Sequence, residues 1–82
     1  MKREFYEYFQ LYNLPQELRA DCNELTVINL GSSSAIVEGL EILTGDQYIS
    51  TGNENEVNTT RYRLSFGAGG TQVVLVIRKI YK

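Results

Sequence analysis

Three consecutive serines and one cysteine are the residues that could act as nucleophiles. Ser32, Ser33 and Ser34 carry hydroxyl groups, and Cys22 is the single cysteine of the 82 residues. Such nucleophiles are usually activated by a neighbouring base, most often histidine, and this sequence has no histidine. Glu38 and Glu41 could form a carboxylate pair, but such spacing is common on the surfaces of strands. The sequence therefore predicts that the protein is not an enzyme.

A glycine-rich segment could be taken for a phosphate-binding loop. Residues 67–70 read Gly-Ala-Gly-Gly, but they lack the lysine of a P-loop, and a strand-like segment follows in place of a helix. The positive end of a helix, which would attract phosphate, is therefore missing. The composition instead favours a flexible hairpin turn.

Oxygen-bearing side chains in the middle of the chain could offer ligands to calcium. The candidates are Asp46, Asn53, Glu54, Asn55 and Glu56. Their spacing is not that of an EF-hand loop, and no bidentate glutamate stands at the required offset. We expect an exposed polar loop at 52–58, with no metal and no cofactor. One cysteine allows no disulfide within the chain, which fits a reducing compartment.

The most unusual stretch is aromatic. Residues 4–14 read E-F-Y-E-Y-F-Q-L-Y-N-L and hold five of the nine aromatic residues. As a helix, the segment would place four of these rings on one face. As a strand, it would place aromatic rings on both faces. The preference of Phe and Tyr for sheets, and the lack of a capping residue, favour the extended alternative.

An extended aromatic segment has one face more than a small core can cover. A protein neighbour could cover the second face, because large aromatic residues are common anchors at interfaces. The competing interpretation is a first strand packed only on the protein's own core. We predict a protein interface formed by the five aromatic residues, Phe5, Tyr6, Tyr8, Phe9 and Tyr12.

Most of the remaining segments are predicted to be strands, with the last strand of the chain at the centre. Residues 71–81 contain the apolar run 73–77, which predicts a central strand buried on both faces. Residues 59–66 alternate, so that Tyr62, Leu64 and Phe66 should point inward. Pro15 predicts a short turn or helix over 15–21.

Several short strands complete the expected fold. The segments 25–30 and 35–38 flank the small residues 31–34, as in a hairpin or a bulged bend, and 40–43 and 47–51 are further short strands. We predict an all-β protein: one small antiparallel β-sandwich or jelly-roll-like domain of about six or seven strands. Residues 1–14 form its aromatic N-terminal segment and residues 15–82 the sandwich.

Charge and hydropathy argue against nucleic acid and membranes as partners. The net charge is −2 and no basic stripe is present, so nucleic acid is not an expected partner. No apolar run approaches the roughly 18 residues of a membrane span. Residues 1–4 lack the apolar region of a signal peptide, which favours a cytoplasmic protein. A chain this short buries only about 60–65% of its unfolded surface, so a partner subunit would add stability.

Residues 25–50 carry a recognisable pattern. They read L-T-V-I-N-L-G-S-S-S-A-I-V-E-G-L-E-I-L-T-G-D-Q-Y-I-S, a strand ending in Asn-Leu-Gly, a small-residue bend, an apolar-Glu-Gly step and a glycine turn before another strand. This pattern resembles small structural proteins of tailed bacteriophage particles. The resemblance implies a non-enzymatic component of the virion, associated with the head or tail and present in symmetric copies, that is made in the host cytoplasm.

Two functions remain open at this point. The first is a structural assembly protein that contacts other copies of itself or other virion proteins. The second is a small ligand- or glycan-binding β-module. Tyr12, Tyr48 and Tyr62 could offer the stacking face that such a module needs, although the chain has no tryptophan.

Overall fold

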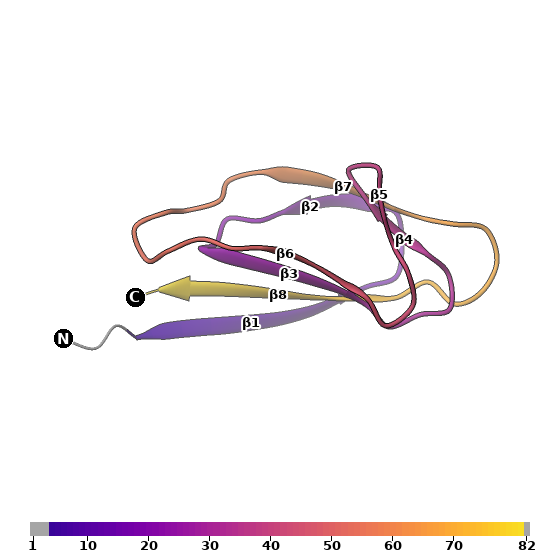
Figure 1. Ribbon diagram of the computed structural model, residues 1–82, viewed down its shortest axis with the longest axis horizontal. Helices are drawn as coiled ribbons and strands as arrows, with labels where there is room; N and C mark the ends of the chain where they lie inside the picture. The colour runs from indigo at the N-terminus through magenta and orange to yellow at the C-terminus, as the bar shows by residue number, and fades with distance from the viewer. Residues whose placement is uncertain (1–3, 82) are drawn as a thin grey trace.

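The computed structural model describes residues 4–81 as two layers of β-sheet (Figure 1). All regular structure among these residues is strand, which confirms the all-β prediction. Eight strands are present: β1 (Phe5–Tyr12), β2 (Gln16–Arg19), β3 (Glu24–Asn29), β4 (Ala35–Val37), β5 (Leu40–Ile42), β6 (Gln47–Ser50), β7 (Arg61–Phe66) and β8 (Val74–Tyr81).

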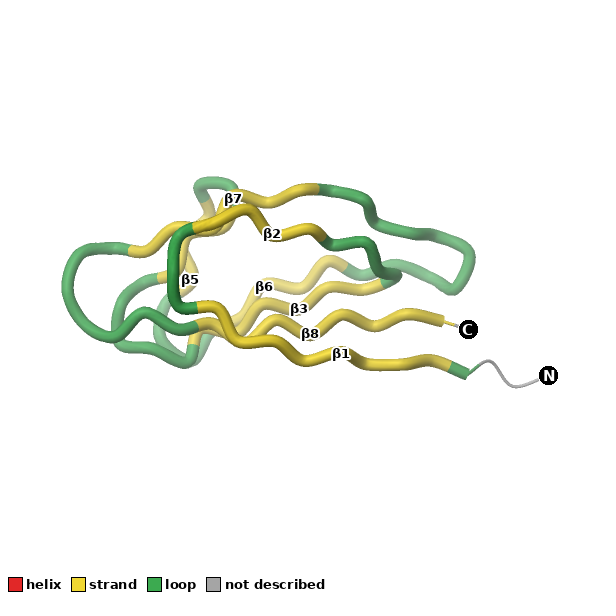
Figure 2. The backbone as a smooth tube through the Cα atoms, turned by 180° about the vertical axis from the view of Figure 1, so that it is seen from behind, coloured by secondary structure: helices red, strands yellow, loops and turns green. Residues whose placement is uncertain are grey.

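The strands form two antiparallel sheets of four. The first sheet has the order β1-β8-β3-β6 and the second the order β2-β7-β4-β5. Most consecutive strands therefore lie in different sheets, and Figure 2 shows the chain passing repeatedly from one layer to the other. Eight strands in this order form a jelly-roll sandwich, which agrees with the predicted fold class.

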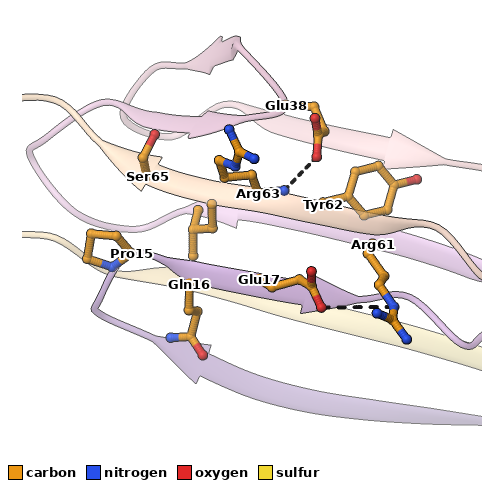
Figure 3. Close-up of a pocket in the computed structure, with 9 residues that line it drawn as sticks. Pro15, Gln16, Glu17, Glu38, Arg61, Tyr62, Arg63 and Ser65 are labelled. Atoms are coloured by element: carbon orange, nitrogen blue, oxygen red, sulfur yellow. Dashed lines mark hydrogen bonds and ion pairs between the residues drawn. The ribbon is translucent and has the colours of Figure 1, made fainter.

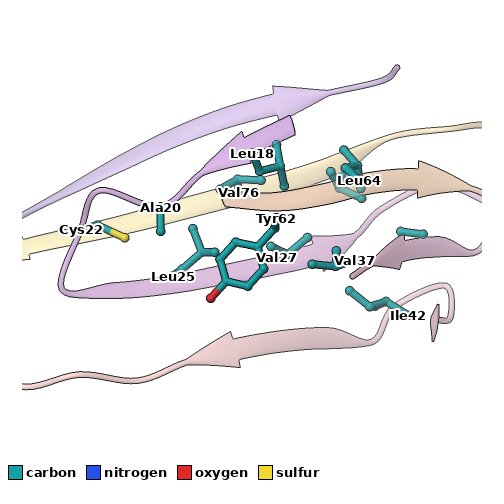
Figure 4. Packing of buried hydrophobic residues seen from close by; sticks show 12 residues of the cluster. Leu18, Ala20, Cys22, Leu25, Val27, Val37, Ile42, Tyr62, Leu64 and Val76 are labelled. Carbon is teal, nitrogen blue, oxygen red and sulfur yellow. The ribbon is translucent and has the colours of Figure 1, made fainter. Parts of the chain in front are cut away.

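The core lies between the two sheets (Figure 4). Each sheet contributes alternate residues of its strands, because successive side chains of a strand point to opposite faces. In β7, Tyr62 and Leu64 are buried while Arg61 and Arg63 are exposed, as the alternation predicted. The buried apolar residues are Leu18, Ala20, Cys22, Leu25, Val27, Ala35, Val37, Ile42, Tyr62, Leu64, Val74 and Val76.

The prediction of a turn or helix over 15–21 is wrong, because residues 16–19 form β2. This strand pairs antiparallel with β7, and Leu18 stands opposite Tyr62. Leu18 is buried between two exposed neighbours, Glu17 and Arg19, which is the period of a strand. Pairing with β7 and burial of Leu18 thus outweigh the local preference of Pro15 for a helix start.

The hairpin predicted at 67–70 and the hairpin alternative for 31–34 are also wrong, because each segment joins strands of different sheets. Residues 31–34 lead from β3 in the first sheet to β4 in the second, and residues 67–70 lead from β7 back towards β8. The two connections pack on each other: Ser33 donates its backbone N–H to the Thr71 carbonyl at 3.0 Å. A Cβ on Gly31 would collide with that carbonyl, so Gly31 permits this close approach.

The last strand is central, as predicted, but only one of its faces is fully buried. β8 lies between β1 and β3 and pairs with both. Val74 and Val76 point into the core and are fully buried, whereas Leu75 and Ile77 are only half-buried. The apolar run therefore covers the core with one face and presents the other on the outer face of the first sheet.

Candidate protein interface

The aromatic segment forms β1, an edge strand of the first sheet. β1 pairs with β8 along its whole length, from Phe5 opposite Tyr81 to Tyr12 opposite Val74. No strand formed by residues 4–81 pairs with its other side, and Figure 2 shows β1 at the margin of its layer. The extended alternative is therefore the one that the structure adopts.

The register shows which backbone groups of β1 face the open edge. The carbonyls of Val73, just before β8, and of Lys79, within it, accept hydrogen bonds from the β3 side, so the odd-numbered residues of β8 direct their backbone groups towards β3. Its even-numbered residues therefore bond to β1, and they stand opposite even-numbered residues of β1. The N–H and C=O groups of Phe5, Glu7, Phe9 and Leu11 consequently point away from β8.

Side chains of β1 occupy both faces of the sheet. Tyr6, Tyr8, Gln10 and Tyr12 lie on the face that carries the core, opposite even-numbered residues of β8. Even here Tyr8 is 54% exposed, since the core cluster does not extend under it. Of the five predicted interface residues only Tyr12 packs against the core.

The outer face of the first sheet is apolar across three strands. Phe9 stands opposite Ile77, and Leu11 stands opposite Leu75. On the next strand, Ile28 is paired with Leu75. Phe9 and Leu11 are each 62% exposed. The sequence analysis did not include Leu11, although its position two residues after Phe9 places it on the same face of a strand.

Cations of β8 contact the aromatic rings of β1. The Lys79 ammonium lies 4.3 Å from the centre of the Phe5 ring and 5.2 Å from that of Tyr81, on the outer face. On the core-bearing face, the Arg78 guanidinium donates to the Tyr12 hydroxyl at 3.0 Å and to the Arg19 carbonyl at 2.9 Å. These contacts hold β1 on β8 and link the two sheets beside it.

A shallow groove lies on the second sheet. It has a volume of about 440 Å³ and lies between β2 and β7 (Figure 3). Its walls carry charges of both signs: the Arg61 guanidinium lies 3.9 Å from the Glu17 carboxylate, and the Glu38 carboxylate accepts the backbone N–H of Arg63. Exposed pairs of this kind contribute little energy. The groove offers no aromatic face, because Tyr62 is buried.

Only two of the three tyrosines considered for ligand stacking contact each other. Tyr48 and Tyr62 contact each other edge to face, with ring centres 6.0 Å apart. Their shared hydrogen bond raises the pKa of the Tyr48 hydroxyl. Burial opposes ionisation of Tyr62, but hydrogen bonds from Asn58 and Ser50 outweigh it and lower the Tyr62 pKa. Tyr12 contacts Arg78 instead.

In the polar loop 52–58, side-chain oxygen atoms accept hydrogen bonds from the backbone of the loop itself. Asn53 accepts the Asn55 N–H through its side chain at 2.9 Å, and Glu56 accepts the Asn53 N–H at 3.3 Å. Asn23 ties this loop to the sheet by donating to the Glu56 carbonyl at 2.6 Å. Among the described residues, no three acidic, cysteine or histidine side chains are arranged to hold a metal ion.

Cys22 is a buried core residue, and we expect it to resist thiol reagents in the folded protein. The side chain is 1% exposed, and its burial raises the pKa of the thiol. The reactive thiolate is therefore scarce and shielded. Labelling with a chromogenic disulfide at pH 8 should be at least a hundred times slower than in urea-unfolded protein. Equal rates would show that this part of the core opens readily.

Comparison with known proteins found no matching family model, no matching curated protein and no matching solved structure. Within residues 4–81, no helix is long and apolar enough to cross a membrane.

Proposed function

We propose that this protein is a non-enzymatic assembly protein that acts through protein–protein contacts made by β1. One observation carries the proposal: β1 is an eight-residue edge strand with exposed aromatic side chains on both faces. Such an edge promotes aggregation unless another chain covers it, and natural proteins usually protect edges with charges, proline or bulges. Within β1 the only charged residue is Glu7, and no proline is present.

We further propose that the protein is a component of a bacteriophage particle, in which it is present in symmetric copies. The support for this part is the resemblance of residues 25–50 to small phage structural proteins. The fold does not decide between the two functions considered, because jelly rolls occur in both viral capsid proteins and lectins. Glycan binding has less support, since the groove lacks a stacking face and Tyr62 is buried.

Phe9→Glu tests the proposed contact. The substitution places a charge on the exposed outer face of β1 and removes no core side chain, so the fold should persist. We expect the wild-type protein to form a closed oligomer in sedimentation equilibrium, and Phe9→Glu to weaken its association at least tenfold.

Leu43→Glu is the matched control. Leu43 is 54% exposed and lies in the loop between β5 and β6, away from β1. Its variant should associate like the wild type. A wild-type protein that stays monomeric at all accessible concentrations, or equal association of Phe9→Glu and wild type, would overturn the proposal.

A further inference from the structure

We infer that the partner of β1 is β1 of a second copy, paired antiparallel about a two-fold axis through Tyr8 to form one eight-stranded sheet. This inference rests on the proposed function and names its partner. The backbone groups of Phe5, Glu7, Phe9 and Leu11 face the open edge, as the register with β8 requires. Another extended segment would replace water as the hydrogen-bond partner of these groups along the whole strand.

Strand length favours a second copy of β1 over the other edges of this chain. β1 has eight residues, whereas the other edge strands described, β2, β5 and β6, have four, three and four. β1 on β6 of another copy would leave half of β1 unpaired. That head-to-tail contact would also generate open chains of molecules. Pairing of β1 with β1 of a second copy instead forms a closed dimer.

The positions of the edge-facing residues select the register. With Tyr8 on the axis, Phe5 pairs with the partner's Leu11, and Glu7 pairs with the partner's Phe9. All four edge-facing residues then exchange backbone hydrogen bonds with one another. A shift that centres the axis on Glu7 would place two carboxylates opposite each other, which is destabilising. A shift to Phe9 would leave Phe5 outside the paired strands.

The exposed side chains of β1 supply the apolar area of the proposed interface. Phe5, Tyr6, Tyr8, Phe9 and Leu11 are between 44% and 62% exposed. At roughly 200 Å² for each large side chain, they present on the order of 500 Å² per chain. Two copies together present about 1,000 Å², and burial of most of this area would bring the contact to the lower bound for a stable specific interface. In the dimer, the apolar outer face of the first sheet of one copy would also continue into that of the other copy.

A cysteine at the axis tests the register. In the proposed dimer the two Tyr8 residues form a pair without backbone hydrogen bonds, and their Cα atoms lie about 4.5 Å apart. This separation permits a disulfide. We expect Tyr8→Cys, in a Cys22→Ala background, to give a covalent dimer on mild oxidation. Glu7→Cys in the same background is the control, because its two copies would lie too far apart to bond.

A proline tests the hydrogen bonding of the edge. Glu7→Pro removes an N–H that faces the open edge, and the bonds between β1 and β8 remain. It should weaken association at least tenfold, whereas Glu7→Val, which loses the same charge but keeps the N–H, should not. Circular dichroism of Glu7→Pro should show an unchanged sheet signal.

Amide exchange provides a readout that needs no substitution. On raising the protein concentration, the amides of Phe5, Glu7, Phe9 and Leu11 should become protected, and the amides of even-numbered β1 residues should change little. If the protein associates in a Phe9-dependent manner but shows neither the Tyr8→Cys dimer nor this alternation, the edge pairing is wrong and the proposed function stands. If it does not associate, both fail.

Discussion

Leu64→Ala should lower the free energy of unfolding by about 2–5 kcal/mol, the range for truncating a large buried aliphatic side chain. Leu64 is 1% exposed and lies in β7, at the centre of the second sheet. Its side chain packs into the core between the sheets (Figure 4), so truncation leaves a cavity that the surrounding strands cannot fill by a small shift. For a domain of this size, a loss of that magnitude is a large part of the whole stability.

Urea denaturation followed by circular dichroism measures this effect. Leu43→Ala is the matched control, because Leu43 is 54% exposed and should change stability by no more than about 0.5 kcal/mol. Equal losses for the two variants would mean that the second sheet does not cover the core as described.

Asn29→Ala should lower the free energy of unfolding by about 3 kcal/mol or more, because a buried polar group left without a partner costs about 1–3 kcal/mol. The Asn29 side chain is fully buried at the end of β3. It donates to the Ser33 carbonyl at 2.7 Å and to the Ile42 carbonyl at 2.9 Å, and it accepts the Gly31 N–H at 2.9 Å. One amide thus bonds to three backbone groups, two in the connection between β3 and β4 and one at the end of β5.

Asn13→Ala is the control for loss of an asparagine, since Asn13 is exposed in the loop after β1. Its effect should stay within about 0.5 kcal/mol, measured by the same urea denaturation. Equal stability of Asn29→Ala and wild type would show that water replaces the amide without loss.

Asn29→Asp should make stability depend on pH in a defined direction. The buried carboxyl would face two carbonyl oxygens, so its folded pKa should rise above the unfolded value of about 3.9. Relative to the wild type, the variant should then be most stable below that value and lose stability as the pH rises from 4 to 7. A difference from wild type that is independent of pH would contradict this description of the Asn29 site.

Local patterns in the sequence were sufficient to predict the strands that alternate strictly. The alternation over residues 59–66 predicted the burial of Tyr62 and Leu64, because the period of a strand places every second side chain on one face. The aromatic and β-branched residues of the first and last strands likewise predicted extended structure for both. These features depend on neighbours in the sequence, so they could be predicted without knowledge of the fold.

The sequence by itself thus determined the fold class, an all-β sandwich, and favoured an extended aromatic segment over a helix. Only the tertiary structure decided that residues 16–19 form a strand, because that depends on pairing with β7 more than forty residues away. It also decided that 31–34 and 67–70 cross between sheets, since small flexible residues suit a hairpin and a crossing equally. The tertiary structure also decided that β1 lies at an open edge, which leaves its aromatic side chains exposed. The order of strands in a sheet depends on contacts between residues distant in sequence, so local sequence patterns cannot predict it.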